Sequence, residues 1–104
     1  MKFVFIAHLA IVALLSGCAT SVPVPAGMKA GQFVTFKCEG GISFQARVAE
    51  DGSTVRVRYE GGYELDNKGA GVYEADGWKL ITQGPSSPEL IHNGKSIGKN
   101  CKAA

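Results

Sequence analysis

The sequence predicts an all-β fold, a small antiparallel β-barrel of eight strands that one disulfide holds together. After Gln32, apolar and polar residues alternate with a period of two, which is typical of strands with one buried face. Turn dipeptides such as Asp51-Gly52, Asp76-Gly77 and Asn93-Gly94 separate most of these runs at intervals of roughly eight to eleven residues, as in an antiparallel meander. No part of the chain after Gln32 shows the periodicity of a helix.

The chain begins with a segment that is typical of a signal peptide. Met1 and Lys2 form a short positive head, and an apolar run from Phe3 to Leu15 follows, broken only by His8. This run is too short to span a bilayer as a helix. We therefore expect it to be the apolar region of an export signal.

Cys18 stands directly after the sequence Leu-Ser-Gly, and this arrangement resembles the bacterial lipobox. A lipobox is cleaved before a cysteine that carries lipid, so residues 1–17 are predicted to be a lipoprotein signal peptide and Cys18 the lipid attachment site. The alternative is an ordinary secretory signal cut near Gly17 or Ala19, which would leave an unpaired thiol in an oxidising compartment. Ala19, in place of an aspartate, resembles the pattern of lipoproteins that are sent to the outer membrane.

The residues after Cys18 have the composition of a linker. Residues 19–31 are mostly small, include prolines and show no periodicity. We therefore expect residues 18–31 to be the lipidated cysteine and a flexible tether, and residues 32–104 to be the β-barrel domain.

The alternation defines eight strands within this domain. They cover residues 32–39, 42–49, 54–60, 63–65, 72–75, 78–83, 89–92 and 95–101. Phe36, Phe44, Val57 and Leu80 are expected to belong to the core. A sheet of this size avoids exposed edges most simply by closing into a barrel, and a sandwich of two sheets is the alternative.

Two cysteines are left once Cys18 carries lipid. Cys38 and Cys101 are expected to form a disulfide, because export makes oxidation the default state of such a pair. This bond would tie the first strand to the last, and by the chain-entropy model it contributes about 4 kcal/mol to stability. His92 alone is left to complete a metal site with these cysteines, so no metal or other cofactor is expected.

Charge and motif content argue against two classes of protein. Without residues 1–17, ten Lys and Arg residues face nine Asp and Glu residues, and this balance does not favour nucleic acid as a partner. Glu64, Asp66 and His92 have the side chains of an acid and a base in a catalytic triad. No sequence motif places a nucleophile with them, so the chain is not expected to be an enzyme. Trp78 is assigned to the core, with a role as a binding anchor as the alternative.

Four motifs follow one another along the domain. They are VTFKCEGG at residues 34–41, GAGVY at 69–73, WKLITQG at 78–84 and LIHNGKSIGKNC at 90–101. In this order and spacing they resemble the periplasmic and membrane-bound inhibitors of c-type lysozyme, a bacterial family that includes lipoproteins and has a small eight-stranded β-barrel. The resemblance agrees with the lipobox and with the disulfide.

The resemblance implies a function and a set of site residues. Family members block the lysozyme cleft with a loop that carries a serine, in a Ser-Gly-x-x-Tyr motif, and with a lysine in a following Lys-Gly turn. The lysozyme site contains a protonated carboxylic acid and a carboxylate. The serine hydroxyl can form hydrogen bonds with the acid, and the lysine ammonium group can bind the carboxylate. Counted from Tyr73, the serine position falls on Gly69 and the lysine position on Gln83, which precedes the expected Gly84.

This chain therefore lacks both polar contacts of the family, although substitutes lie nearby. Lys68 precedes Gly69, and two serines, Ser86 and Ser87, follow Gly84. The inhibitory surface is expected in a loop around residues 66–71 and a second around 83–88. The candidate partner-binding residues are Lys68, Gly69, Ala70, Gly71, Tyr73, Gln83 and Gly84.

The expected partners are c-type lysozyme and, through the lipid anchor, the outer membrane. Some relatives of the same barrel resemble adhesins, and the loss of the two inhibitory residues would suit such a change. The alternative function is therefore that of a surface adhesin or envelope-binding lipoprotein without lysozyme inhibition. A structural lipoprotein that binds glycan is a third possibility.

Overall fold

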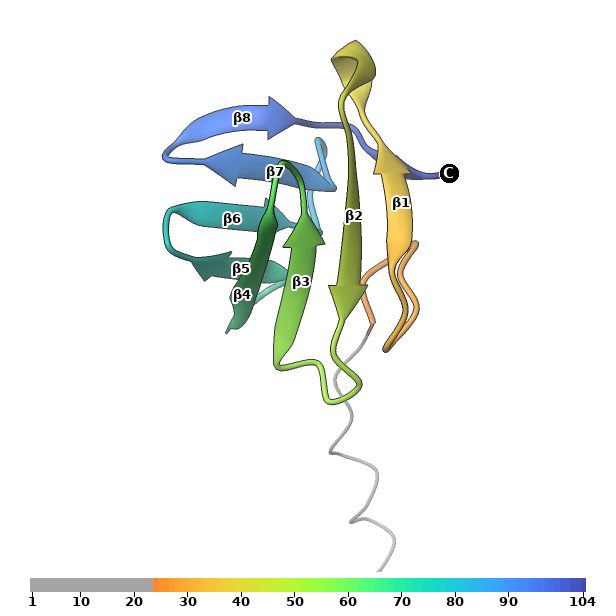
Figure 1. Ribbon diagram of the computed structural model, residues 1–104, viewed down its shortest axis with the longest axis vertical. Coiled ribbons are helices and arrows are strands. Elements are labelled where there is room, and N and C mark those ends of the chain that lie inside the picture. The colour runs from red at the N-terminus through yellow and green to blue at the C-terminus, as the bar shows by residue number, and fades with distance from the viewer. Residues whose placement is uncertain (1–23) are drawn as a thin grey trace, which may run out of the picture.

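The computed structural model describes residues 24–104, which form nine β-strands and one short 3-10 turn (Figure 1). The elements are β1 (Val34–Lys37), η2 (Glu39–Gly41), β2 (Ser43–Val48), β3 (Thr54–Arg58), β4 (Gly62–Gly69), β5 (Val72–Ala75), β6 (Trp78–Ile81), β7 (Glu89–His92), β8 (Lys95–Gly98) and β9 (Lys102–Ala103). The predicted signal peptide, residues 1–17, and the predicted lipid attachment at Cys18 lie outside the described residues.

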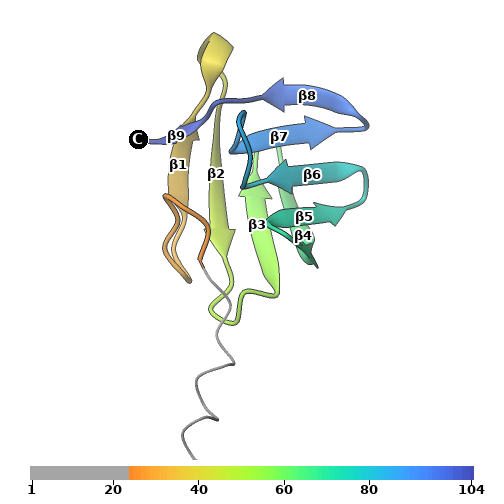
Figure 2. The ribbon, with the colours of Figure 1, turned by 180° about the vertical axis from the view of Figure 1, so that it is seen from behind.

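The nine strands belong to one antiparallel sheet in the order β8-β7-β6-β5-β4-β3-β2-β1-β9. Each strand from β1 to β8 pairs with the next along the chain, and β9 pairs with the other edge of β1. The sheet curls into a half-barrel: β1, β2 and β3 stand nearly upright in Figure 1, and β6, β7 and β8 lie to one side of β1 and β2 and run nearly at right angles to them, as Figure 2 also shows from behind. The predicted antiparallel all-β fold is confirmed, with nine strands in place of eight.

The core lies inside the curled sheet and is built from the apolar residues of the alternating pattern. Phe36, Phe44, Val57 and Leu80, which the pattern placed there, are at most 2% exposed. Phe36 and Phe44 face each other across β1 and β2, with ring centroids 5.5 Å apart. Burial of each such side chain contributes about 1.5–3 kcal/mol to folding.

Two-residue turns fix the register of two hairpins. Asp76 and Gly77 join β5 to β6 with φ of 54° and 83°, and Asn93 and Gly94 join β7 to β8 with φ of 50° and 80°. A positive φ at both positions is what the type I′ turn requires, and the twist of that turn matches the twist of the strands. The turns predicted at Asp-Gly and Asn-Gly are therefore confirmed.

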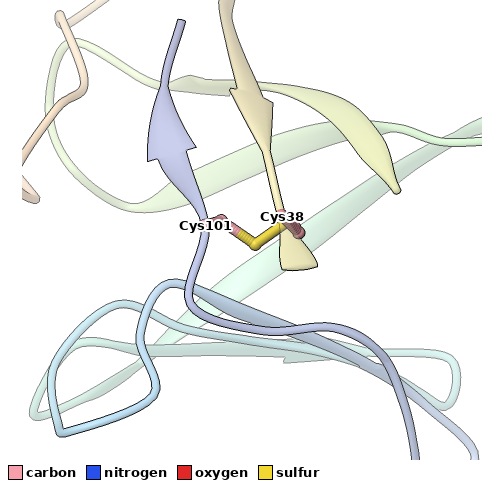
Figure 3. The surroundings of a disulfide bond; sticks show 2 residues. All are labelled: Cys38 and Cys101. Atoms are coloured by element: carbon pink, nitrogen blue, oxygen red, sulfur yellow. A yellow bond between two sulfur atoms is a disulfide. The ribbon is translucent and has the colours of Figure 1, made fainter. Parts of the chain in front are cut away.

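A disulfide joins Cys38, directly after β1, to Cys101, directly before β9 (Figure 3). The predicted pairing is confirmed. Close to it, the N–H of Glu39 donates to the carbonyl of Lys99 at 3.1 Å, and the N–H of Cys101 donates to the carbonyl of Pro88 at 3.2 Å. The disulfide and the short β1–β9 ladder thus hold the C-terminal end of the chain to β1, and within residues 24–104 no ladder runs between β8 and β1.

Two strands differ from the prediction by more than two residues at one end, and the other differences are of one or two residues. The short strand expected at residues 63–65 is the eight-residue strand β4, because the residues after Leu65 continue to pair with β5. These residues are Asp, Asn, Lys and Gly, which are uncommon in strands and therefore looked like a loop. The strand expected at 95–101 ends at Gly98, and the chain forms β9 only after the disulfide.

Residues 24–31, which were assigned to the tether, lie against the sheet, and we call them the strap. Met28 belongs to the core and is 8% exposed. The N–H of Gly31 donates to the carbonyl of Val48 in β2 at 2.8 Å. Burial of Met28 is the physical reason that this part of the segment is held to the domain. Between residues 24 and 104 there is no helix with the length and apolar character needed to cross a membrane.

Candidate partner-binding site

The β4–β5 hairpin carries most of the predicted site residues. Strand β4 extends to Gly69, so the loop expected at residues 66–71 is reduced to a turn of two residues, Ala70 and Gly71. Lys68 therefore lies in the strand and not in a loop. Ala70 and Gly71 have φ of 54° and 79°, again as a type I′ turn requires. The result is a slim hairpin with an exposed tip.

A β-bulge deforms β4 just before this turn. The register shifts between Asn67 and Gly69, and the Asn67 Oδ1 accepts a hydrogen bond from the N–H of Gly69 at 2.8 Å. The Asn67 Nδ2 donates to the carbonyl of Gly52 at 2.9 Å, which fixes the side chain. Gly69 has φ of 95°, a region that glycine adopts far more readily than serine. The local backbone thus suits glycine at position 69, where the lysozyme inhibitors that the motifs resemble have a serine.

The tip of the hairpin is clamped to the residues that follow β6. The N–H and the hydroxyl of Thr82 both donate to the carbonyl of Gly71, at 2.9 and 2.8 Å. A Cβ atom at Gly71 would lie 2.8 Å from the Cγ of Gln83, so a side chain at this position would force the junction apart. The fold thereby places Gln83 against the hairpin tip.

A hollow of about 420 Å³ opens beside this junction. The predicted residues that line it are Gly69, Ala70, Gly71, Tyr73 and Gln83. Asn67, Thr82 and part of the strap complete the lining. Among the described residues, no charged side chain lines the hollow, so it offers amides, hydroxyls and apolar surface to a partner.

The strap forms a wall of the hollow that the sequence did not predict. Val24, Pro25 and Ala26 line it, and Val24 is 45% exposed. Met28 was the signal that could have revealed this packing, because it is a large apolar residue among small ones. Asn67 and Thr82 gave no signal of their own.

Two of the predicted residues lie outside the lining of the hollow. Lys68 is exposed, and Gly84 belongs to the second predicted loop, residues 83–88. In that loop the hydroxyl of Ser87 donates to the carbonyl of Gly84 at 2.8 Å, which closes a turn. Of residues 83–88, Gln83 alone contributes to the lining.

Tyr73 connects the hollow to the core, and burial raises the pKa of its hydroxyl above the usual 10.0. The folded protein therefore favours the neutral phenol. This contribution to stability is complete below pH 10.0 and is lost as the pH rises through the folded pKa. We expect Tyr73→Phe to lose less stability than the parent as the pH rises above 10.0, measured as the shift of the urea midpoint. If the urea midpoints of the two proteins fall equally as the pH rises, Tyr73 does not contribute to the pH dependence of stability.

Trp78 lies in the core, as the sequence favoured. It is 6% exposed and lies between the rings of Tyr63 and His92, whose centroids are 4.4 and 4.0 Å from its own.

Glu64, which has the side chain of an acid in a catalytic triad, accepts a hydrogen bond from the hydroxyl of Thr54 at 2.6 Å. Across residues 24–104, no three His, Cys, Asp or Glu side chains gather as a set of metal ligands.

Comparisons of the chain with protein families, with curated proteins and with solved structures find no match. A function for the hollow is therefore inferred from its geometry and from the four motifs of the sequence.

Proposed function

We propose that this chain is a lipid-anchored inhibitor of c-type lysozyme, held in the outer membrane through Cys18. The observation that carries the proposal is that residues 69–71 and Gln83 lie around one hollow although they are separate in sequence. These are the two places that the motif resemblance assigns to the inhibitory surface. The curled antiparallel sheet and the disulfide agree with the fold that the same resemblance implies.

The slim β4–β5 hairpin has a shape that can enter a narrow cleft. The affinity for lysozyme then depends on the polar groups beside the hairpin tip. A lysozyme cleft holds one protonated and one ionised carboxyl group. The amide of Gln83 can donate a hydrogen bond to either of them, but it lacks the charge of a lysine. A hydrogen bond to a charged group contributes about 1.5–3 kcal/mol, against about 1 kcal/mol for a neutral pair. We therefore expect a weaker complex than lysine at this position would form.

The direct test is a titration of the processed chain, from residue 18 onward, into a c-type lysozyme while lysis of peptidoglycan is followed. The strap is kept, because residues 24–26 form one wall of the hollow. Inhibition at micromolar concentration or below would support the proposal. Absence of inhibition by a chain with its disulfide formed would contradict it.

Gln83→Lys is expected to strengthen inhibition about tenfold or more, because the ammonium group adds charge to the bond with the lysozyme carboxylate. Gln83 is exposed, so the change leaves the core untouched. Gln83→Glu is the matched control, and we expect it to weaken inhibition by repulsion between like charges. The measurement is the inhibition constant of each variant. Equal constants for lysine and glutamate would show that Gln83 does not face the carboxylates.

The uncharged lining of the hollow favours a second candidate, a surface adhesin or envelope-binding lipoprotein with the same fold. Lys68→Ala separates the two functions. Lys68 is exposed next to the hairpin tip, and in an inhibitor its loss should raise the inhibition constant about twofold to fivefold, as for an exposed ion pair. Lys95→Ala, at an exposed position of β8, is the matched control. Binding to host cells that survives Lys68→Ala, without lysozyme inhibition, would favour the adhesin.

A further inference from the structure

Two arginine side chains lie over one aromatic ring on the outer face of the sheet, because the strand neighbours of both arginines, such as Ala46 and Val57, point into the core. The guanidinium carbon of Arg58 is 3.7 Å from the centroid of the Phe33 ring, and that of Arg47 is 4.7 Å from it. Phe33 directly precedes β1, Arg47 belongs to β2 and Arg58 ends β3. We call these three residues the Arg–Phe cluster. Stacking on the ring positions both cations at the surface.

Neither arginine of the cluster forms a direct ion pair among residues 24–104, although Arg47 is close enough to Glu64 to help lower the pKa of that carboxyl. The ion pair of this face joins Arg56 to Glu64 at 3.2 Å. Arg58 donates to the neutral amide oxygen of Gln45 at 3.5 Å, and Arg47 lies opposite Arg56 in the ladder of β2 and β3. Like charges that face each other destabilise a sheet. The cluster thus presents two cations that no carboxylate binds directly, and an external anion can bind them.

The two guanidinium groups lie near each other because both contact the same ring. Their central carbons can be no more than 8.4 Å apart, which is the sum of their distances to the ring centroid. A guanidinium group that lies over a ring keeps its N–H edge free, and this edge matches a pair of phosphate oxygens. Phosphate groups at a lipid surface can therefore accept hydrogen bonds from each arginine.

The cluster also lies beside the strap, which leads toward the proposed lipid anchor. Phe33 follows the strap by two residues. Arg47 is the neighbour of Val48, whose carbonyl accepts a hydrogen bond from the N–H of Gly31 in the strap at 2.8 Å. The chain from Cys18 to Val24 advances by only six residues, which span at most about 20 Å. A domain anchored at Cys18 therefore keeps this face within reach of the bilayer.

We propose that the Arg–Phe cluster binds the phosphate groups of anionic phospholipids, so that the domain rests with this face against its own membrane. Lys29 lines the same shallow hollow as Phe33 and adds a cation to the contact. That the phosphate belongs to a lipid rests on the proposed function, in which Cys18 carries a lipid anchor. The affinity for phosphate rests on the cluster alone.

The test uses the chain from residue 18 onward with Cys18→Ser, so that no attached lipid holds it on a membrane. Co-sedimentation with phosphatidylcholine vesicles is measured with and without phosphatidylglycerol. We expect binding only where phosphatidylglycerol is present. Arg47→Gln and Arg58→Gln are each expected to weaken it about fivefold, the contribution of one arginine near an anionic surface. Lys95→Gln makes the same change of charge at an exposed residue of β8, and it should leave the affinity unchanged.

Three results would overturn the proposal. An equal loss in Lys95→Gln would show that net charge alone drives binding, and equal binding to both kinds of vesicle would show that anionic lipid is not recognised. Full competition by inorganic phosphate, at the concentration of the lipid phosphate, would assign the cluster to free phosphate. Folding of each variant is checked by the disulfide and by Trp78 fluorescence. Because lysozyme inhibition is a separate measurement, failure here leaves the inhibitor proposal standing.

Discussion

Replacement of Cys38 and Cys101 together by alanine is expected to lower the free energy of unfolding by about 4 kcal/mol. The bond joins residues with a sequence separation of 63, and the loop it closes contains β2 to β8. Without it, the unfolded chain gains conformational entropy. The bond lies beside the β1–β9 ladder, which pairs only two residues of each strand, and no ladder between β8 and β1 forms within residues 24–104. Urea denaturation of both proteins under oxidising conditions measures the difference.

A serine pair at the same positions is the matched control. Cys101 is 4% exposed, so a serine there must bury its hydroxyl, and an unsatisfied buried hydroxyl costs about 1–3 kcal/mol more. The reduced parent protein should unfold at nearly the same urea concentration as the alanine pair. If the alanine pair instead unfolds with the oxidised parent, closure of the loop contributes nothing to stability.

The strands could be predicted wherever alternation alone decided them. In β2, Phe44, Ala46 and Val48 are buried and the residues between them are more exposed, so a period of two was visible in the sequence. The polar end of β4 could not be predicted in this way. It is a strand because Asp66 and Asn67 pair with β5, and a contact between two segments is not contained in the propensity of either.

The candidate site was predictable only in part. Gly69 and Gln83 came from the spacing of motifs, and the structure places both around one hollow. The clamp between Gly71 and Thr82, which brings them together, depends on the curl of the sheet and leaves no pattern in the sequence. The strap was missed because small residues and prolines look the same in a free linker and in a packed segment.

Trp78→Ala is expected to lower the free energy of unfolding by about 3–5 kcal/mol. Trp78 begins β6, and its indole lies between Tyr63 of β4 and His92 of β7. Tyr59, which follows β3, meets the indole edge-on with centroids 6.3 Å apart. Loss of the ring would open a cavity where strands from both halves of the curled sheet meet. Far-UV circular dichroism during urea denaturation measures the change, because the variant lacks the single tryptophan of the chain.

Trp78→Phe and His92→Ala separate cavity formation from stacking. Phenylalanine fills much of the space and should cost clearly less than alanine, whereas His92→Ala removes one stacked pair, worth about 0.5–1.5 kcal/mol. Equal costs for Trp78→Ala and His92→Ala would show that burial of the indole contributes little. The stack links β4 to β6, and the same two strands lead to the clamp between Gly71 and Thr82. Trp78→Ala is therefore expected to weaken lysozyme inhibition as well as stability, while His92→Ala leaves inhibition close to that of the parent.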